Sequence, residues 1–132
     1  MWNELLDGNS QDVSGSAYLF KKLALPSSSG IQLVDLSQII RLEAQNNYTL
    51  LFTLVGKEIM ISKPLSKLDA SLDSSIFIRV HKSHVINLLH AIEYKNGDDQ
   101  VILMRDNSAI QISRRRLGEF KEALKKHFVF VQ

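Results

Sequence analysis

Short runs of alternating apolar and polar residues follow one another along most of the chain, and polar turn residues interrupt them roughly every ten positions. Such runs are typical of short β-strands joined by hairpins. The clearest run, 48–54, places four large side chains on one face, which we expect to point inward: Tyr48, Leu50, Phe52 and Leu54. Thr49 and Thr53 fall on the opposite face.

The same pattern predicts about ten short strands. They lie within residues 18–25, 31–34, 39–44, 48–54, 58–62, 91–95, 101–104 and 109–112, with two more inside the segment 77–87. Strong hairpin signals such as Asn96-Gly97 separate neighbouring runs. The fold should therefore be mostly β, with small and largely antiparallel sheets rather than one parallel α/β sheet.

Two segments carry helical spacing instead. The first begins near Pro64, which suits a first helical turn, and it repeats leucine at i, i+3 and i+7: Leu65, Leu68 and Leu72. The second follows Ser113, whose side chain we expect to cap the helix. Its apolar stripe consists of Leu117, Phe120 and Leu124.

Composition divides the chain into three parts. Residues 1–20 are rich in Gly, Ser, Asn and Asp, and we expect a flexible tether that remains from a connection to an upstream domain. Residues 21–127 should form one folded domain, and residues 128–132 an apolar C-terminal tail.

Composition also excludes several classes of protein. The sequence has no cysteine, which excludes disulfides, thiolate nucleophiles and cysteine-based zinc sites. No apolar run reaches the ~18 residues that span a bilayer. The N-terminus lacks the features of a signal peptide. We therefore expect a cytoplasmic protein with no membrane association.

Positive charge gathers near the C-terminal end. The whole chain carries a net charge of +2, but residues 105–126 contain seven basic and three acidic residues, a surplus of +4. Arg114, Arg115 and Arg116 are adjacent, and their mutual repulsion favours an anionic partner such as phosphate. The alternative is a solvated, charged helix start.

Segment 77–87 places a basic, hydrogen-bonding group between two apolar strands. His81 and His84 lie three positions apart, which on one strand points them to opposite faces, and no carboxylate stands at a useful spacing. Ser83 beside them lacks a nucleophile elbow and an orienting acid, so a Ser83–His84 hydrolase is disfavoured. We predict no catalytic residue, no metal site and no cofactor.

Nucleic-acid binding explains these polar segments better. Asn46, Asn47 and Tyr48 offer amide and aromatic edges, and asparagine can pair bidentately with adenine. Lysine and arginine suit guanine or phosphate. The candidate DNA-binding residues are Asn46, Asn47, Tyr48, Lys63, His81, Lys82, Ser83, Arg114, Arg115 and Arg116. From the residues alone, Lys82 and the three arginines can each donate to base acceptors or to phosphate.

Four segments, in this order and spacing, together resemble the LytTR DNA-binding domain. They are EAQNNYT at 43–49, SKPL at 62–65, FIRVHKSHVIN at 77–87 and ISRR at 112–115, the last preceded by Ile110 and Gln111. The resemblance covers roughly residues 23–124. Its most specific part is the arginine-x-histidine-x-serine core at 79–83 followed by Asn87.

The resemblance implies an elongated arrangement of small sheets that reads double-stranded DNA with loops in the major groove. It implies the output domain of a two-component response regulator, bound to direct repeats in promoters and monomeric until paired on DNA. The receiver domain of such a regulator is missing from this chain. The family's base contacts fall here on the 46–48 turn, on Lys82 and on Arg114. Because the family varies the position of Lys82, the target sequence does not carry over.

The main alternative is a non-catalytic β module that binds a protein or an acidic ligand through the same basic face. Discrimination between duplexes separates the two, because a basic patch alone has no sequence preference. Within the motif, His81 and Asn87 can be structural hydrogen-bonding residues. Arg79 can pair with Glu43 or another acid at the core edge instead of phosphate.

Overall fold

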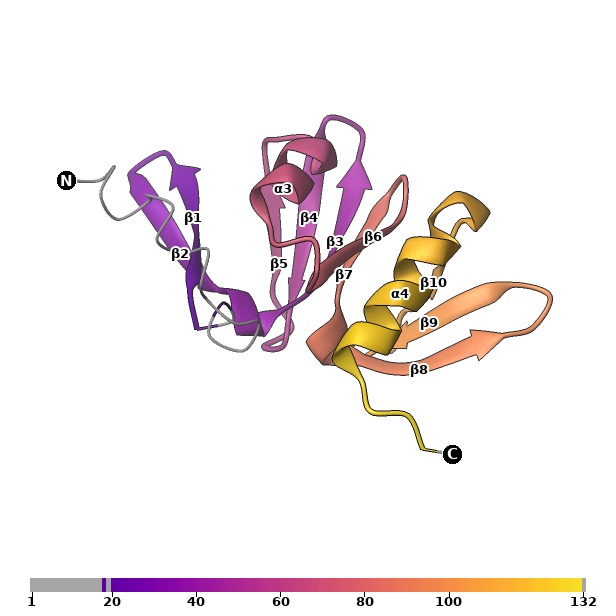
Figure 1. Ribbon diagram of the computed structural model, residues 1–132. Helices are drawn as coiled ribbons and strands as arrows, with labels where there is room; N and C mark the ends of the chain where they lie inside the picture. Colours follow the sequence, from indigo (N-terminus) through magenta and orange to yellow (C-terminus); the bar gives the residue numbers. More distant parts are fainter. Residues whose placement is uncertain (1–17, 19, 132) are drawn as a thin grey trace. The chain divides into compact units, whose positions relative to one another are not determined.

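The computed structural model describes residue 18 and residues 20–131, and the chain divides after Ser37 into two units, which we describe separately (Figure 1). In the first unit, strand β1 (Lys22–Ser27) pairs antiparallel with β2 (Gly30–Asp35), which is the hairpin that the sequence predicts. The 3-10 turn η2 (Leu36–Gln38) follows it. The predicted tether at residues 1–20 falls almost entirely outside the described residues.

The second unit contains a five-stranded sheet with the strand order β5-β4-β3-β7-β6, in which all neighbours are antiparallel. Its strands are β3 (Ile39–Gln45), β4 (Tyr48–Thr53), β5 (Glu58–Ile61), β6 (Phe77–His81) and β7 (His84–Asn87). Helix α3 (Leu65–Ser71) joins β5 to β6 and lies over one face of the sheet (Figure 1). Leu65, Leu68 and Leu72 are buried, as their spacing predicts.

A three-stranded antiparallel sheet and a helix complete this unit. The elements are η3 (Leu88–His90), β8 (Ala91–Asn96), β9 (Gln100–Met104), β10 (Ala109–Gln111), η4 (Arg114–Arg116) and α4 (Leu117–His127). Within residues 20–131 there are ten strands in small antiparallel sheets and two α-helices. The predicted mostly β fold class is confirmed.

The core of the second unit lies between the two sheets and α4. It consists of Ile40, Ile78, Val80, Ile86, Leu88, Ile102, Met104, Ile110, Ile112, Phe120 and Ala123. Phe120 is fully buried and meets the Tyr94 ring edge-on, with ring centroids 5.1 Å apart. Leu117 and Leu124 pack partly buried against the same core, so the predicted stripe of α4 faces inward.

The predicted inward face of β4 is wrong. Thr49, Leu51 and Thr53 are buried, whereas Tyr48, Leu50 and Phe52 are half-buried. The two threonines tolerate burial because their hydroxyls donate to the carbonyl oxygens of Lys63 (2.8 Å) and Lys57 (3.0 Å). The other face is covered as well, since the Arg41 guanidinium lies 3.7 Å above the Phe52 ring. Because both faces of β4 are covered, the polarity of its residues does not reveal which face points into the core.

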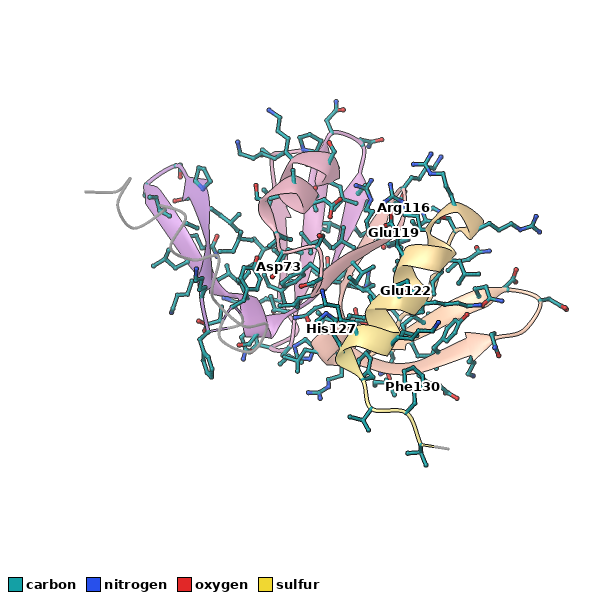
Figure 2. All side chains as sticks on the ribbon, viewed as in Figure 1. Asp73, Arg116, Glu119, Glu122, His127 and Phe130 are labelled. Carbon is teal, nitrogen blue, oxygen red and sulfur yellow. The ribbon has the colours of Figure 1, made fainter. Side chains whose placement is uncertain are left out.

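The end of the chain also departs from prediction at Ser113. Its side chain makes no capping hydrogen bond, and its backbone N–H donates instead to the carbonyl of Val80 (2.9 Å). Arg114–Arg116 then form a 3-10 turn before α4 begins. Residues 128–131 form neither helix nor strand and are exposed, with Phe130 in this tail (Figure 2). No helix in the described part of the chain is long and apolar enough to cross a membrane.

Candidate nucleic-acid interface

Three polar segments meet at one end of the five-stranded sheet. They are the β3–β4 turn (45–48), the β6–β7 turn (81–84) and the segment 113–116 before α4 (Figure 1). The backbone N–H of Ala44 donates to the Ser83 carbonyl (2.9 Å), which joins the first two segments. The bond from Ser113 to Val80 joins the third. Strand order causes this convergence, because β3 lies directly beside β7.

The β3–β4 turn presents its amides outward. Gln45 pairs with Tyr48 at the ends of the two strands, which leaves Asn46 and Asn47 as a two-residue loop. Asn46 has φ 56°, in the left-handed region that asparagine tolerates better than most residues. Both asparagines are exposed and Tyr48 is half-buried. Their polar groups therefore face solvent at the tip.

Arg79 holds the β6–β7 turn from inside. Its Nε donates to the His81 carbonyl (2.8 Å), and its Nη2 donates to the carbonyl of Lys82. Nη1 pairs with Asp69 on α3 at 3.4 Å. From the sequence we expected that Arg79 can pair with an acid at the core edge instead of phosphate, and the acid in the structure is Asp69 rather than Glu43. Lys82 itself is exposed.

Two further motif residues have structural contacts. Asn87 is fully buried; its Nδ2 donates to the Ile39 carbonyl (2.9 Å), and its Oδ1 accepts the Leu89 N–H (3.0 Å) at the start of η3. His81 is half-buried, and its Nδ1 accepts the backbone N–H of Ser83 (3.1 Å). The structural hypothesis is therefore supported for Asn87, and His81 stabilises the turn in which Lys82 lies.

The arginine segment lies beside this turn. Arg114 and Arg115 are exposed and Arg116 is half-exposed; Figure 2 shows Arg116 where α4 begins, with His127 at the other end of that helix. An open hollow joins this segment to the β6–β7 turn, and its lining consists of His81, Lys82, Ser113, Arg115 and Arg116. Such a hollow concentrates positive potential.

Lys63 lies beside the β3–β4 turn. It is exposed, and its carbonyl accepts the hydroxyl of Thr49, which is the second residue of β4. The structure therefore gathers all ten predicted DNA-binding residues at one end of the second unit.

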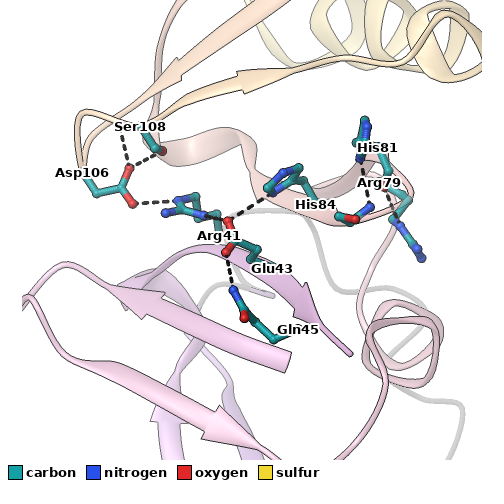
Figure 3. A network of polar contacts seen from close by, with 9 residues as sticks. Arg41, Glu43, Gln45, Arg79, His81, His84, Asp106 and Ser108 are labelled. Atoms are coloured by element: carbon teal, nitrogen blue, oxygen red, sulfur yellow. Dashed lines mark hydrogen bonds and ion pairs between the residues drawn. The ribbon is translucent and has the colours of Figure 1, made fainter. Parts of the chain in front are cut away.

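A polar network behind the turns was not predicted (Figure 3). Arg41, with its side chain only 10% exposed, donates from Nε to Asp106 Oδ2 (2.7 Å) and from Nη1 to Glu43 Oε1 (3.1 Å). Glu43 Oε2 accepts the Gln45 amide (2.9 Å), and Oε1 lies 3.7 Å from His84 Nδ1. The signal in the sequence was an arginine within the apolar run Ile39–Leu42.

Electrostatics in this network favour an ionised Asp106 and a neutral His84 imidazole. Burial lowers the pKa of His84, Glu43 opposes that effect, and the nearby His81 and Arg41 lower it further. For Asp106, burial raises the pKa, but hydrogen bonds from Ser108 and Arg41 outweigh it, so the pKa lies below the ordinary value. In the described part of the chain, no three histidines or carboxylates gather as a metal site would require.

Comparison with known proteins identifies relatives. A model of the family described as "LytTr DNA-binding domain" matches residues 29–125. The "Heme-containing CO-sensing transcriptional regulator RcoM 2" of Paraburkholderia xenovorans is 32% identical over 106 residues, which cover 78% of this chain and 39% of that protein. The "Sensory transduction protein LytT" of Bacillus subtilis is 30% identical over 105 residues, with 78% and 43% covered.

A solved structure shares the fold. It is the LytTr DNA-binding domain of a putative methyl-accepting/DNA response regulator from Bacillus cereus, with a TM-score of 0.66 and 20% sequence identity. The match covers 79% of this chain and 96% of that chain. The chain spans about two-fifths of the length of the two curated relatives.

Proposed function

The chain belongs to the LytTR DNA-binding domain family, and we propose that it reads a specific double-stranded DNA sequence with the three segments at the end of its five-stranded sheet. The convergence of these segments, which brings exposed asparagines, Lys82 and the arginine triplet to one surface, carries the proposal. The major groove of B-DNA is about 12 Å wide and admits a two-stranded β-ribbon, so hairpin tips can reach base edges.

The proposal assigns separate roles to the basic side chains. Lys82 and Arg114 contact bases, because a cation at an exposed tip can donate to the guanine acceptors in the major groove. Arg115, Arg116 and Lys63 contact phosphates, which fixes the position of the protein without reading sequence. Asn46, Asn47 and Tyr48 contact a second groove segment, while His81 and Ser83 complete the β6–β7 turn. The module is non-catalytic.

We further propose that the domain is the output part of a sensory regulator that controls transcription in the cytoplasm. A receiver domain of the two-component type would precede it, and two copies would pair on direct repeats in a promoter, each copy being monomeric without DNA. The relative named as a sensory transduction protein supports that context. The relative named as a heme-containing CO-sensing transcriptional regulator supports a role in sensory control of transcription.

Selection of bound duplexes from a random pool, followed by a salt titration on the selected duplex, tests the proposal. We expect a repeated motif, and a scrambled duplex should bind at least about a hundredfold more weakly, which corresponds to about 3 kcal/mol. If no motif emerges and binding fades uniformly with salt, the face is only electrostatic. The alternative of a module for a protein or an acidic ligand then replaces this one.

A further inference from the structure

Glu43 lies on β3 between the two hairpin turns of the interface, where it accepts a hydrogen bond from Gln45 in one turn and stands opposite His84 at the edge of the other. Resting on the proposed function, we propose that Glu43 is a positioning residue that sets the spacing of the β3–β4 and β6–β7 turns and thereby determines sequence discrimination. It would do so without contacting DNA. This role is additional to those of the ten candidate DNA-binding residues.

The two carboxylate oxygens of Glu43 serve different partners (Figure 3). Oε2 accepts the side-chain amide of Gln45, which directly precedes Asn46 in the β3–β4 turn. Oε1 faces Nδ1 of His84, the residue directly after Ser83 and the cross-strand partner of Glu43 on β7. The carboxylate is thus hydrogen-bonded to the base of one turn and lies 3.7 Å from His84 Nδ1 at the base of the other, a ring nitrogen that is buried without a hydrogen bond to any residue that the structure describes.

Arg41 holds this carboxylate in place. Its guanidinium is fixed by Asp106 on one side and lies over the Phe52 ring, so the contact to Glu43 Oε1 comes from an immobilised donor. Charged hydrogen bonds of this kind are stronger and more directional than neutral ones. The spacing of the turns is therefore coupled to the β9–β10 turn, from which Asp106 comes.

The negative charge of Glu43 and its proposed positioning role predict opposite effects of a substitution on DNA binding. A carboxylate near a phosphate-binding surface repels DNA, and at physiological salt that repulsion extends over about 8 Å. Removing the negative charge of Glu43 should then strengthen binding to every duplex. A loss of affinity confined to the selected duplex has the opposite sign, so it identifies a positioning role.

The substitution Glu43→Gln leaves the fold supported. Arg41 retains Asp106 and the Phe52 ring, so no buried guanidinium loses all its partners. Glutamine keeps one acceptor oxygen, so Arg41 and Gln45, which now bond to separate oxygens of Glu43, would no longer each have an oxygen of their own. Glu58→Gln is the matched control, because it removes the same charge from an exposed position on β5 of the same sheet.

The test measures dissociation constants for the selected and a scrambled duplex with the wild-type chain, Glu43→Gln and Glu58→Gln. We expect Glu43→Gln to bind the selected duplex about tenfold more weakly, about 1.4 kcal/mol, and the scrambled duplex no more weakly than wild type. Backbone amide NMR shifts should change in both turns, at 46–48 and at 81–83. Glu58→Gln should retain wild-type discrimination.

Other outcomes overturn the proposal. Unchanged or tighter binding of the selected duplex by Glu43→Gln means that Glu43 contributes only charge, and equal weakening for both duplexes means that it supports only the fold. If Glu43→Gln does not fold, Gln45→Ala breaks one of its contacts, and discrimination should fall only at the base pairs nearest 46–48; an unchanged preference there overturns the proposal. If the wild-type chain binds the selected and the scrambled duplex equally well, the proposed function itself is rejected. The measurement on the wild-type chain shows this before any variant is tested.

Discussion

The β6–β7 turn and the β8–β9 turn are both short polar hairpin connections in the same unit, but they are held in different ways. Arg79 in β6 bonds the carbonyls of the first turn from within the same hairpin. Two other segments also contact that hairpin: Ala44 of β3 bonds the turn, and Ser113 bonds β6, the strand that leads into it. The β8–β9 turn is closed locally, by Gly97 N–H to the Asp99 carbonyl (3.2 Å) and by Gln100 to the Gly97 carbonyl (3.5 Å).

Their charges differ as well. Lys82 lies at the tip of the β6–β7 turn beside the arginine triplet, whereas exposed Asp98 and Asp99 lie at the tip of the β8–β9 turn. Preorganised turns lose less conformational entropy on binding, and positive ones are attracted to phosphate. Turn residues alone therefore do not identify a binding turn; its cross-links to other segments and the sign of its charge do.

Arg79→Ala should produce the largest difference between the two turns. It removes the donor to two turn carbonyls and leaves Asp69 without its cation, so we expect the free energy of unfolding to fall by about 2 kcal/mol. Asp99→Ala in the exposed β8–β9 turn should change it by less than about 0.5 kcal/mol. Urea denaturation measures both, and equal losses would remove the distinction.

Arg114→Ala should alter which sequences are bound. An arginine that contacts a base contributes about 1–3 kcal/mol of discrimination at that position, so the variant should accept other bases at one position of the selected motif. Binding to duplexes substituted at each position measures this. A uniform loss over all substituted duplexes would move Arg114 to the phosphate-contacting group.

Arg115→Ala should weaken all sequences alike. Loss of one phosphate contact lowers the slope of log affinity against log salt by about 0.9. Salt titrations of the variant and the wild type, on the selected and scrambled duplexes, measure this slope. A sequence-dependent loss would instead give Arg115 a role in reading bases.

Acidification should weaken the fold through His84. Its pKa is lowered in the folded state, chiefly by burial, and has the ordinary value of 6.5 when unfolded. The stability that depends on neutral His84 is therefore complete above pH 6.5 and is lost as the pH falls through the lowered folded value. Unfolding measured from pH 7.5 to 5 should show this loss, and His84→Gln should reduce it. An identical pH profile for that variant would exclude His84 as the cause.

The double substitution Asp98→Asn and Asp99→Asn should have the smallest effect. The β8–β9 turn carries no proposed contact to DNA, so removal of its charges should strengthen binding to selected and scrambled duplexes equally, and by less than about threefold, about 0.7 kcal/mol. Competition binding measures this. A change in sequence preference would place the β8–β9 turn within the DNA interface.

Local features of the sequence predicted most of the elements. Asn46-Asn47 specifies a turn because asparagine tolerates the left-handed φ that Asn46 adopts, Asn96-Gly97 marks the place where β8 ends, and the leucine spacing after Pro64 specifies a helix face. The inner face of β4 was not predictable in this way, because burial of a threonine depends on an acceptor such as the Lys63 carbonyl, contributed by a distant segment.

The residues that support the interface were the hardest to predict. Arg41 and Asp106 are 65 positions apart, and no periodic pattern links them. The grouping of the three segments depends on β3 lying beside β7, which the alternation of each strand does not specify. The resemblance to a family supplied that grouping. The hydrogen bonds from Arg79 to the β6–β7 turn and the contacts of Glu43 came from the structure.

The most direct test of the account follows backbone amide NMR signals while the selected duplex is added to the wild-type chain. We expect the largest changes at residues 45–48, 81–84 and 113–116, and little change at 96–100. Changes centred on residues 96–100, or equally large at 96–100 and at 81–84, would contradict the conclusion that the β3–β4 turn, the β6–β7 turn and segment 113–116 read DNA.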